Sequence, residues 1–454
     1  MNVAAQTQVQ GAQPLPADPV LASLIEESLA VRPEVQQATS TATAERERIS
    51  QAGALPDPVL SLGIQNDGFN GLQIGTMETS YWQVMLSQGL PWPGKRDFRR
   101  DVARIGAEQA DTSVTRARLG AEADVRRSYL DLILARDRLA LLAKLEELWI
   151  QSSGLARARY EAGEGAQSDL LRAQLELSRL RQRRATLQAS ERTSLQSLNR
   201  LRARPLDTPI VTRATTRDLE DPVATDLAAA TDDALHRSPE LARARLGVTR
   251  ATTALALARR ERFPDLSVNA GVMPRGQLEP MWVAGISVGL PVWSGRKQGR
   301  AVAENAARAE SDARGAEAVE QVLRLRVAER QAALGALLET LRISRGGLLV
   351  QSRATVDSTL AQYRVGRVTF ASVLEANAGL LNDEEGFLTT LSEAHRLTIA
   401  AYEVSLDPVA PSGGGGMGGT SVPGAGASGS AQSSASPAGA APAAAATSSM
   451  SSGM

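Results

Sequence analysis

The chain has 454 residues, enough for two or three ordinary domains, but an aromatic content of 3% leaves little material for compact aromatic-rich cores. Apolar residues make up 43% of the sequence and are mostly Ala, Leu and Val, which favours long helices packed through small side chains. Lys plus Arg and Asp plus Glu each number 50, so the basic surplus typical of a nucleic-acid-binding protein is absent. Because cysteine is absent, disulfides, thiol catalysis and thiolate metal sites are excluded.

The two ends of the chain differ in composition from the rest. Residues 1–18 are predicted to be flexible, and they lack the charged start and apolar core of a signal peptide. Residues 409–454 carry no charge and consist mostly of Gly, Ser, Ala and Pro, so they are predicted to form a disordered tail. No run of 18 or more apolar residues occurs, which excludes a transmembrane helix.

Between these ends, four short motifs occur twice, in the same order and about 200 residues apart. This recurrence predicts two structurally equivalent halves, residues 19–205 and 206–408. The motif pairs are Arg32-Pro33-Glu34 with Ser238-Pro239-Glu240, Leu55-Pro56-Asp57 with Phe263-Pro264-Asp265, residues 91–96 with 291–297, and Tyr160-Glu161-Ala162-Gly163 with Tyr363-Arg364-Val365-Gly366.

Each half is predicted to begin with short helices, followed by two segments in which apolar residues alternate with small or polar ones. The alternation predicts strands with one apolar face over about 58–66, 80–90, 265–273 and 281–290. The residues expected to face lipid are Leu60, Leu62, Ile64, Trp82, Val84, Leu86, Leu266, Val268, Trp282, Ile286 and Val288. A length of roughly 8–10 residues suits a tilted transmembrane strand. Four of the five tryptophans fall in or just after these segments, as in an interfacial aromatic girdle.

A soluble antiparallel sheet packed on one face would show the same alternation. The repeat and the tryptophan positions favour the membrane. Four strands cannot close a barrel in lipid, where open edges are not tolerated, so several chains would have to share one barrel. Its polar inner face would then line a water-filled pore.

Long helices are predicted next in each half, over about 97–160 and 166–203, and then over about 297–363 and 369–405. Apolar residues recur in them every seven positions, which indicates coiled-coil packing. The recurring residues are Leu134, Leu141, Leu148 and Leu155, then Val327, Leu334, Leu341 and Leu348, and finally Val373, Leu380 and Phe387. A helix of 55–60 residues is about 85 Å long, more than a bilayer is thick. Each helix pair turns at a Tyr-x-x-Gly, where Gly163 and Gly366 permit a left-handed backbone.

With these features, the chain resembles the TolC-like outer membrane efflux proteins over roughly residues 20–408. The Leu-Pro-Asp-Pro at 55–58 and the Leu-Pro-Trp-Pro-Gly-Lys-Arg at 90–96 are most similar to the CzcC-type branch, which commonly serves heavy-metal resistance-nodulation-division pumps. The resemblance implies a mainly α fold with a small transmembrane β part. Two tandem repeats per chain would form, in a trimer, a 12-stranded β-barrel in the outer membrane, continued by an α-helical tunnel in the periplasm.

The same resemblance implies a periplasmic adaptor protein and an inner-membrane pump as partners, and no cofactor. The adaptor-contacting tips would be Ala162, Gly163 and Glu164 in the first half and Val365, Gly366 and Arg367 in the second. The periplasmic aperture would be ringed by Asp169, Arg172, Ser372 and Glu375, a mixture of signs where the family often has acidic rings. Ordinary solvated helix-end charges are the alternative explanation. Because such proteins are exported, we expect the export signal to have been trimmed or to lie upstream of residue 1.

No motif predicts catalysis: no phosphate-binding loop or zinc-ligand spacing occurs, and His236 and His395 are expected to be structural. We therefore predict a passive exit duct rather than an enzyme, with heavy-metal cations as the cargo on family analogy alone. Two alternatives stay open. One is the same channel exporting organic drugs, other small molecules or a secreted polypeptide. The other is a soluble periplasmic coiled-coil adaptor or tether, although an adaptor would need a further strand-built domain.

Overall fold

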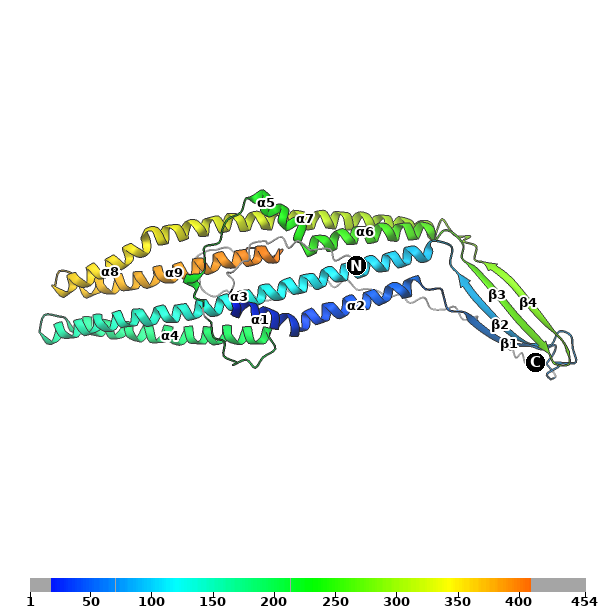
Figure 1. The fold of residues 1–454 in the computed structure, drawn as a ribbon, viewed down its shortest axis with the longest axis horizontal. Coiled ribbons are helices and arrows are strands. Elements are labelled where there is room, and N and C mark those ends of the chain that lie inside the picture. The colour runs from blue at the N-terminus through cyan, green and yellow to red at the C-terminus, as the bar shows by residue number, and fades with distance from the viewer. Residues whose placement is uncertain (1–17, 70, 213, 410–454) are drawn as a thin grey trace, which may run out of the picture. The chain divides into compact units, whose positions relative to one another are not determined.

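A computed structural model describes residues 18–69, 71–212 and 214–409, which form helices and one small antiparallel sheet (Figure 1). The first elements are α1 (Pro19–Val31), α2 (Pro33–Gly53), β1 (Val59–Gln65), β2 (Tyr81–Leu90), α3 (Lys95–Glu161) and α4 (Gln167–Leu201). After a 3-10 turn (Thr216–Asp218) come α5 (Leu227–Arg237), α6 (Pro239–Arg260), β3 (Leu266–Arg275), β4 (Leu278–Val288), α7 (Gln298–Ile343), a π-helical turn (Ser344–Leu348), α8 (Leu349–Arg364) and α9 (Phe370–Glu403). The predicted mainly helical fold with a small sheet is confirmed. The predicted N-terminal segment and C-terminal tail lie outside the described residues, apart from residues 18 and 409.

The short helices begin where the sequence supplies caps. Asp18 accepts a hydrogen bond from the Val20 amide at 2.9 Å, and Ser238 accepts one from the Leu241 amide at 3.2 Å. Proline occupies the first turn of α1, α2 and α6, where its missing N–H has no helical partner to lose. The recurring Pro-Glu motifs at 33–34 and 239–240 are therefore helix starts.

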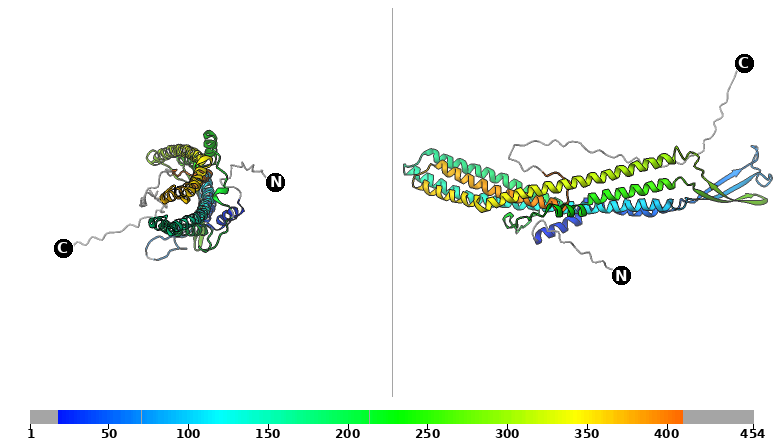
Figure 2. Two further views of the ribbon diagram at one scale, coloured as in Figure 1. Left: turned by 90° about the vertical axis from the view of Figure 1, so that its left-hand side faces the viewer. Right: turned by 90° about the horizontal axis from the view of Figure 1, so that it is seen from above.

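The helix α3 organises the described part of the chain. Its 67 residues correspond to about 100 Å and lead from the sheet to the turn before α4 (Figure 1). It packs against α2, α4, α6 and α9, and the α3/α4 and α8/α9 hairpins lie side by side (Figure 2). Successive clusters of buried aliphatic side chains join the helices, with Leu132, Leu142 and Leu388 among the least exposed members.

The apolar seam of α7 and α8 shifts by one residue at the π-helical turn. Leu341 is buried, but Leu348 is 40% exposed, so the prediction that Leu348 continues the seven-residue seam is wrong. A π turn takes up one extra residue, and the seam resumes at Leu349 and continues through Val356 to Tyr363, all buried. Two adjacent glycines at 346 and 347 lie within this turn.

The four strands are antiparallel in the order β1-β2-β3-β4, so that the strands of the two halves join through β2 and β3. The register pairs Leu62 with Val84 between β1 and β2 and Val84 with Val272 between β2 and β3. Within the described residues, β1 and β4 are the two outer strands, and each has one edge unpaired.

Candidate functional site

One face of the sheet is apolar apart from Gln88. Directly paired residues in an antiparallel sheet project to the same side, so the register decides which side chains share a face. The paired rows on this face are Leu60-Leu86-Ala270-Ala284, Leu62-Val84-Val272-Trp282 and Ile64-Trp82, with Gln88-Val268-Ile286 and Leu90-Leu266-Val288 nearer the helices. The pairing thus brings the eleven residues named from the alternation onto one side.

That apolar face is uncovered in the described residues. Leu62, Trp282 and Ile286 are 73%, 79% and 72% exposed, values that a packed core residue never shows. Leu266 is half-buried because it lies where the sheet meets the helices. The opposite face carries small and polar side chains, including Ser61, Ser87 and Asn269. An apolar patch of this kind on a chain otherwise rich in surface charge marks an interaction surface.

The helix ends at the predicted tips are built alike. Gly163 and Gly366 have φ angles of 77° and 75°, in the left-handed region that glycine occupies at little cost. The Glu164 amide donates to the Arg159 carbonyl at 2.9 Å, and the Arg367 amide donates to the Gln362 carbonyl at 2.9 Å. With the hydrogen bonds donated by the glycine amides, both ends are Schellman motifs. The six predicted tip residues are all exposed.

The two turns are tied to each other. An Arg159 Nη1 donates to the Tyr363 carbonyl at 2.5 Å, and the guanidinium lies 5.0 Å from the centre of the Tyr363 ring. Tyr363 also contacts Phe370 in a buried cluster that includes Ala156 and Ala173. The ends of the two hairpins therefore behave as one packed unit.

The four predicted aperture residues follow these turns on α4 and α9. Asp169 is half-buried close to Tyr363, and the pKa of the Tyr363 hydroxyl is raised, first by burial and then by the Asp169 charge. Arg172 and Glu375 are exposed and form no ion pair with any other described residue. Ser372 and Glu375 line an open groove of about 450 Å³ between α8 and α9.

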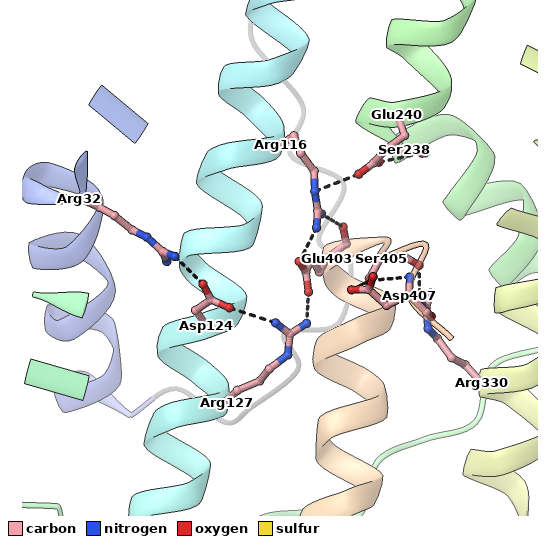
Figure 3. Close-up of polar contacts among 10 residues, drawn as sticks. All are labelled: Arg32, Arg116, Asp124, Arg127, Ser238, Glu240, Arg330, Glu403, Ser405 and Asp407. Carbon is pink, nitrogen blue, oxygen red and sulfur yellow. Dashed lines mark hydrogen bonds and ion pairs between the residues drawn. The ribbon is translucent and has the colours of Figure 1, made fainter. Parts of the chain in front are cut away.

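A buried ion-pair network surrounds the end of α9, and the sequence analysis missed it (Figure 3). The Glu403 side chain is only 4% exposed; its Oε1 accepts from Arg116 at 2.6 Å and its Oε2 from Arg127. Arg116 also pairs with Glu240 of α6 at 2.9 Å, and Arg127 pairs with Asp124 at 3.3 Å. This network joins α9 to α3 and α6. The sequence signal for a buried Glu403 was its position four residues after Ile399 on the buried stripe of α9.

Beyond Glu403 the chain leaves the helix through Val404, whose φ is 54°. Arg330 of α7 donates to the Ser405 carbonyl, and Arg326 donates to the Leu406 carbonyl at 3.0 Å. Arginines of α7 therefore hold the segment that follows α9.

A second buried carboxylate lies halfway along α9. Glu384 is 3% exposed and pairs with Arg353 of α8 and with Arg217 of the 3-10 turn. Burial alone would raise the pKa of Glu384, but the hydrogen bonds from Arg353 and Arg217 outweigh it, and the pKa is lowered. Its position seven residues before Leu391 in a buried row was the available signal for a charge in the core.

The histidines lie apart from each other on different helices. His236 is exposed on α5, 3.5 Å from Asp232, and His395 is buried on α9. Across residues 18–69, 71–212 and 214–409, no group of three or more His, Asp or Glu side chains has the arrangement of a metal site. In the same ranges no helix is long and apolar enough to cross a bilayer.

The fold combines long antiparallel helical hairpins with a four-stranded sheet whose apolar face is exposed, and a comparison with known families gives its class. The sequence matches the outer membrane efflux protein family over residues 24–203 and 230–393, and the chain belongs to that family. Members of this family are channels. No curated protein sequence matches the chain.

Solved structures show the same fold at low sequence identity. The outer-membrane channel OprN has a TM-score of 0.73 at 21% identity, covering 85% of this chain and 90% of that one. CusC has a TM-score of 0.73 at 16% identity over 85% and 92% of the two chains. VceC from Vibrio cholerae has the same score at 16% identity over 85% and 96%. The chain therefore spans nearly the full length of these channels.

Proposed function

We propose that the protein is the outer-membrane channel of a tripartite efflux system, a passive duct that works as a trimer and docks a periplasmic adaptor and an inner-membrane pump. The observation that carries this proposal is the sheet: its apolar face is aligned in register across four strands and exposed, while both outer edges are unpaired. Open edges are unacceptable in hydrocarbon, so edges of further copies must cover them. Three copies would supply a barrel of twelve strands.

The proposal gives each region a role. Residues 19–205 and 206–408 act as tandem repeats, and both contribute a strand pair to the barrel and a helical hairpin to a periplasmic tunnel. The tips at 162–164 and 365–367 contact the adaptor, and Asp169, Arg172, Ser372 and Glu375 line the aperture beside them. Exposure of the tips and of Arg172 and Glu375 supports these roles. Membership of the efflux family favours this duct over a soluble adaptor or tether.

The cargo is proposed on narrower grounds. The motifs at 55–58 and 90–96 are most similar to the CzcC-type branch, which points to heavy-metal cations. The four aperture residues include two acids, Asp169 and Glu375, and one base, Arg172, and this excess of negative charge suits a cationic solute. Organic drugs are the alternative cargo for the same duct.

The duct is tested by expressing the full chain with an export signal, fractionating the membranes and measuring conductance in planar bilayers. We expect recovery from the outer membrane only with detergent, a threefold-symmetric particle and a persistent open or gated conductance. Recovery as a monomer from buffer without detergent would reject the channel.

The cargo is tested separately in the source cells. Deletion of the gene should sensitise them to divalent metal salts and leave their sensitivity to lipophilic drugs unchanged. The reverse pattern would replace the metal assignment with the drug assignment and leave the duct intact.

A further inference from the structure

The motifs at the junction between sheet and helices occur twice in the sequence, but among the described residues only one of the two copies is joined by side-chain contacts. Where β2 leads into α3, Lys95 Nζ donates to Asp265 Oδ1 at 2.7 Å and to the Phe263 carbonyl at 2.8 Å. The Trp92 amide donates to the same Asp265 oxygen at 2.8 Å, and the Trp92 ring stacks on Phe263 at 5.5 Å with the planes 10° apart. We call this contact of Trp92 and Lys95 with Phe263 and Asp265 the clasp.

The residues corresponding to the clasp in the other copy of each motif are identified by sequence and by backbone. Leu55-Pro56-Asp57 matches Phe263-Pro264-Asp265. On the other side, the Lys95 amide donates to the Trp92 carbonyl at 3.1 Å, and the Arg296 amide donates to the Trp293 carbonyl at 3.0 Å. The Lys297 amide donates to the same Trp293 carbonyl at 3.0 Å, so the spacing decides: a basic residue follows the tryptophan by three positions and a glycine by one, at Lys95 and at Arg296.

In the described residues, these corresponding residues do not make the contacts that Trp92, Lys95, Phe263 and Asp265 make in the clasp. Trp293 is 68% exposed and Leu55 is 44% exposed, whereas Trp92 is half-buried and Lys95 is buried. Asp57 and Arg296 are exposed, and neither forms an ion pair with another residue in the described ranges. Asp57 precedes β1 and Arg296 follows β4, the two outer strands of the sheet, so they are separated by its whole width.

We propose that a second copy of this chain closes the open clasp: Trp293 and Arg296 of one subunit seat on Leu55 and Asp57 of the next. This inference rests on the proposed trimeric channel and adds which residues join the subunits. The chemistry is complementary: a carboxylate and a guanidinium, neither paired with any residue that the structure describes, would meet, and an exposed indole would meet an exposed leucine. Arginine suits the site because its planar fork can bind the carboxylate with two hydrogen bonds.

The strand register between subunits follows from the residues before the clasp, where Leu90-Pro91 corresponds to Leu290-Pro291; Val292 is one extra residue between this pair and Trp293, so the strands and the clasp differ by one in numbering. Transferring the β2–β3 register to β4 and the neighbour's β1 yields the pairs Val288 with Leu60, Ile286 with Leu62, and Ala284 with Ile64. All six side chains belong to the apolar face, and Ser287 then pairs with Ser61 on the polar face. A shift of one residue would set the apolar residues of one strand against the polar residues of the other. The transferred register is thus the one that keeps the lipid-facing surface continuous.

Disulfide trapping tests the register, because the chain has no native cysteine to interfere. The double variant L62C/I286C should form covalent dimers and trimers on oxidation in membranes, and at least tenfold more of them than the off-register variant L62C/S287C. The variant Q88C/V268C, whose residues pair within one chain, is the matched control and should cross-link without any gain in mass. Trimeric particles that cross-link better through S287C would overturn the register while leaving the channel intact. Absence of any trimer in the wild type would instead reject the proposed function.

Charge exchange tests the clasp itself. D57R and R296D should each lower the temperature at which the detergent-solubilised trimer dissociates, and D57R/R296D should restore most of the loss. K297D, which reverses the neighbouring charge, is the control for a general electrostatic effect and should change that temperature less than R296D does. Single variants as stable as the wild type, or a double variant worse than either, would overturn the clasp.

Discussion

The sheet and the helices of this chain are stabilised in opposite ways. Along α3 and α9 the described residues contain buried aliphatic clusters and buried ion pairs, with Leu388 and Leu132 fully covered. No described residue covers the apolar face of the sheet in this way, and Leu62 and Trp282 are mostly exposed on it. The contrast shows that the helical part forms its core within one chain, whereas burial of the apolar face of the sheet would come from lipid and neighbouring copies under the proposed function.

The largest difference in stability should appear when the same apolar volume is removed from the helical part and from the sheet. Leu388→Ala leaves a cavity in a fully covered site and should cost about 4 kcal/mol of stability. Leu62→Ala removes the same atoms from an uncovered face and should barely change the unfolding of the helices. Circular dichroism at 222 nm, followed against temperature in detergent, measures both. Equal losses would mean that the sheet has a hidden core.

Removing a buried charge from the helical part should cause the next largest loss of stability. Glu403→Ala leaves Arg116 and Arg127 without their shared carboxylate and should cost about 3 kcal/mol. The matched control is Glu339→Gln, which breaks an exposed pair with Arg342 and should leave the melting temperature unchanged. A Glu403 variant as stable as this control would show that the pairs to Glu240 and Asp124 compensate.

Local patterns in the sequence predicted the sheet and the helices, because alternation and seven-residue spacing are short-range signals. The apolar rows across Leu62, Val84 and Val272 needed the register, which the alternation leaves open to sliding. The π turn at 344–348 gave no signal in the spacing, so the seam was continued to Leu348 instead of Leu349. The carboxylates of Glu384 and Glu403 pair with residues distant in sequence, and no local pattern names such partners.

Acid should weaken the helical part through Glu384. Its pKa is lowered in the folded chain below the ordinary value of 4.5, so its contribution is present above that value and is lost as the pH falls through the folded pKa. The melting temperature of the wild type should therefore drop as the pH is lowered from about 5 towards 3. Glu384→Gln should melt lower at pH 7 but show a shallower acid dependence. Glu375→Gln, an exposed acid of the same helix, should keep the wild-type profile.

The smallest predicted effect is the difference in stability between alanine variants of the two helix turns. Replacing either glycine with alanine should lower stability by about 1 kcal/mol, because both glycines have a left-handed backbone conformation. At Gly163 no atom of the described residues lies within 4 Å of the added carbon, whereas at Gly366 the added carbon would lie 3.1 Å from an Arg159 Nη2. Because Arg159 also donates to the Tyr363 carbonyl, Gly366→Ala should disturb the tie between the turns and be the worse of the two.

Limited proteolysis at the turns measures that difference, and efflux measures its consequence. Replacing both glycines with valine should disrupt the two Schellman motifs and impair docking of the adaptor. If the double variant exports cargo as the wild type does, the turns do not carry the adaptor contact. If Gly163→Ala proves the worse single variant, the Arg159 tie is not what holds the two hairpin ends together.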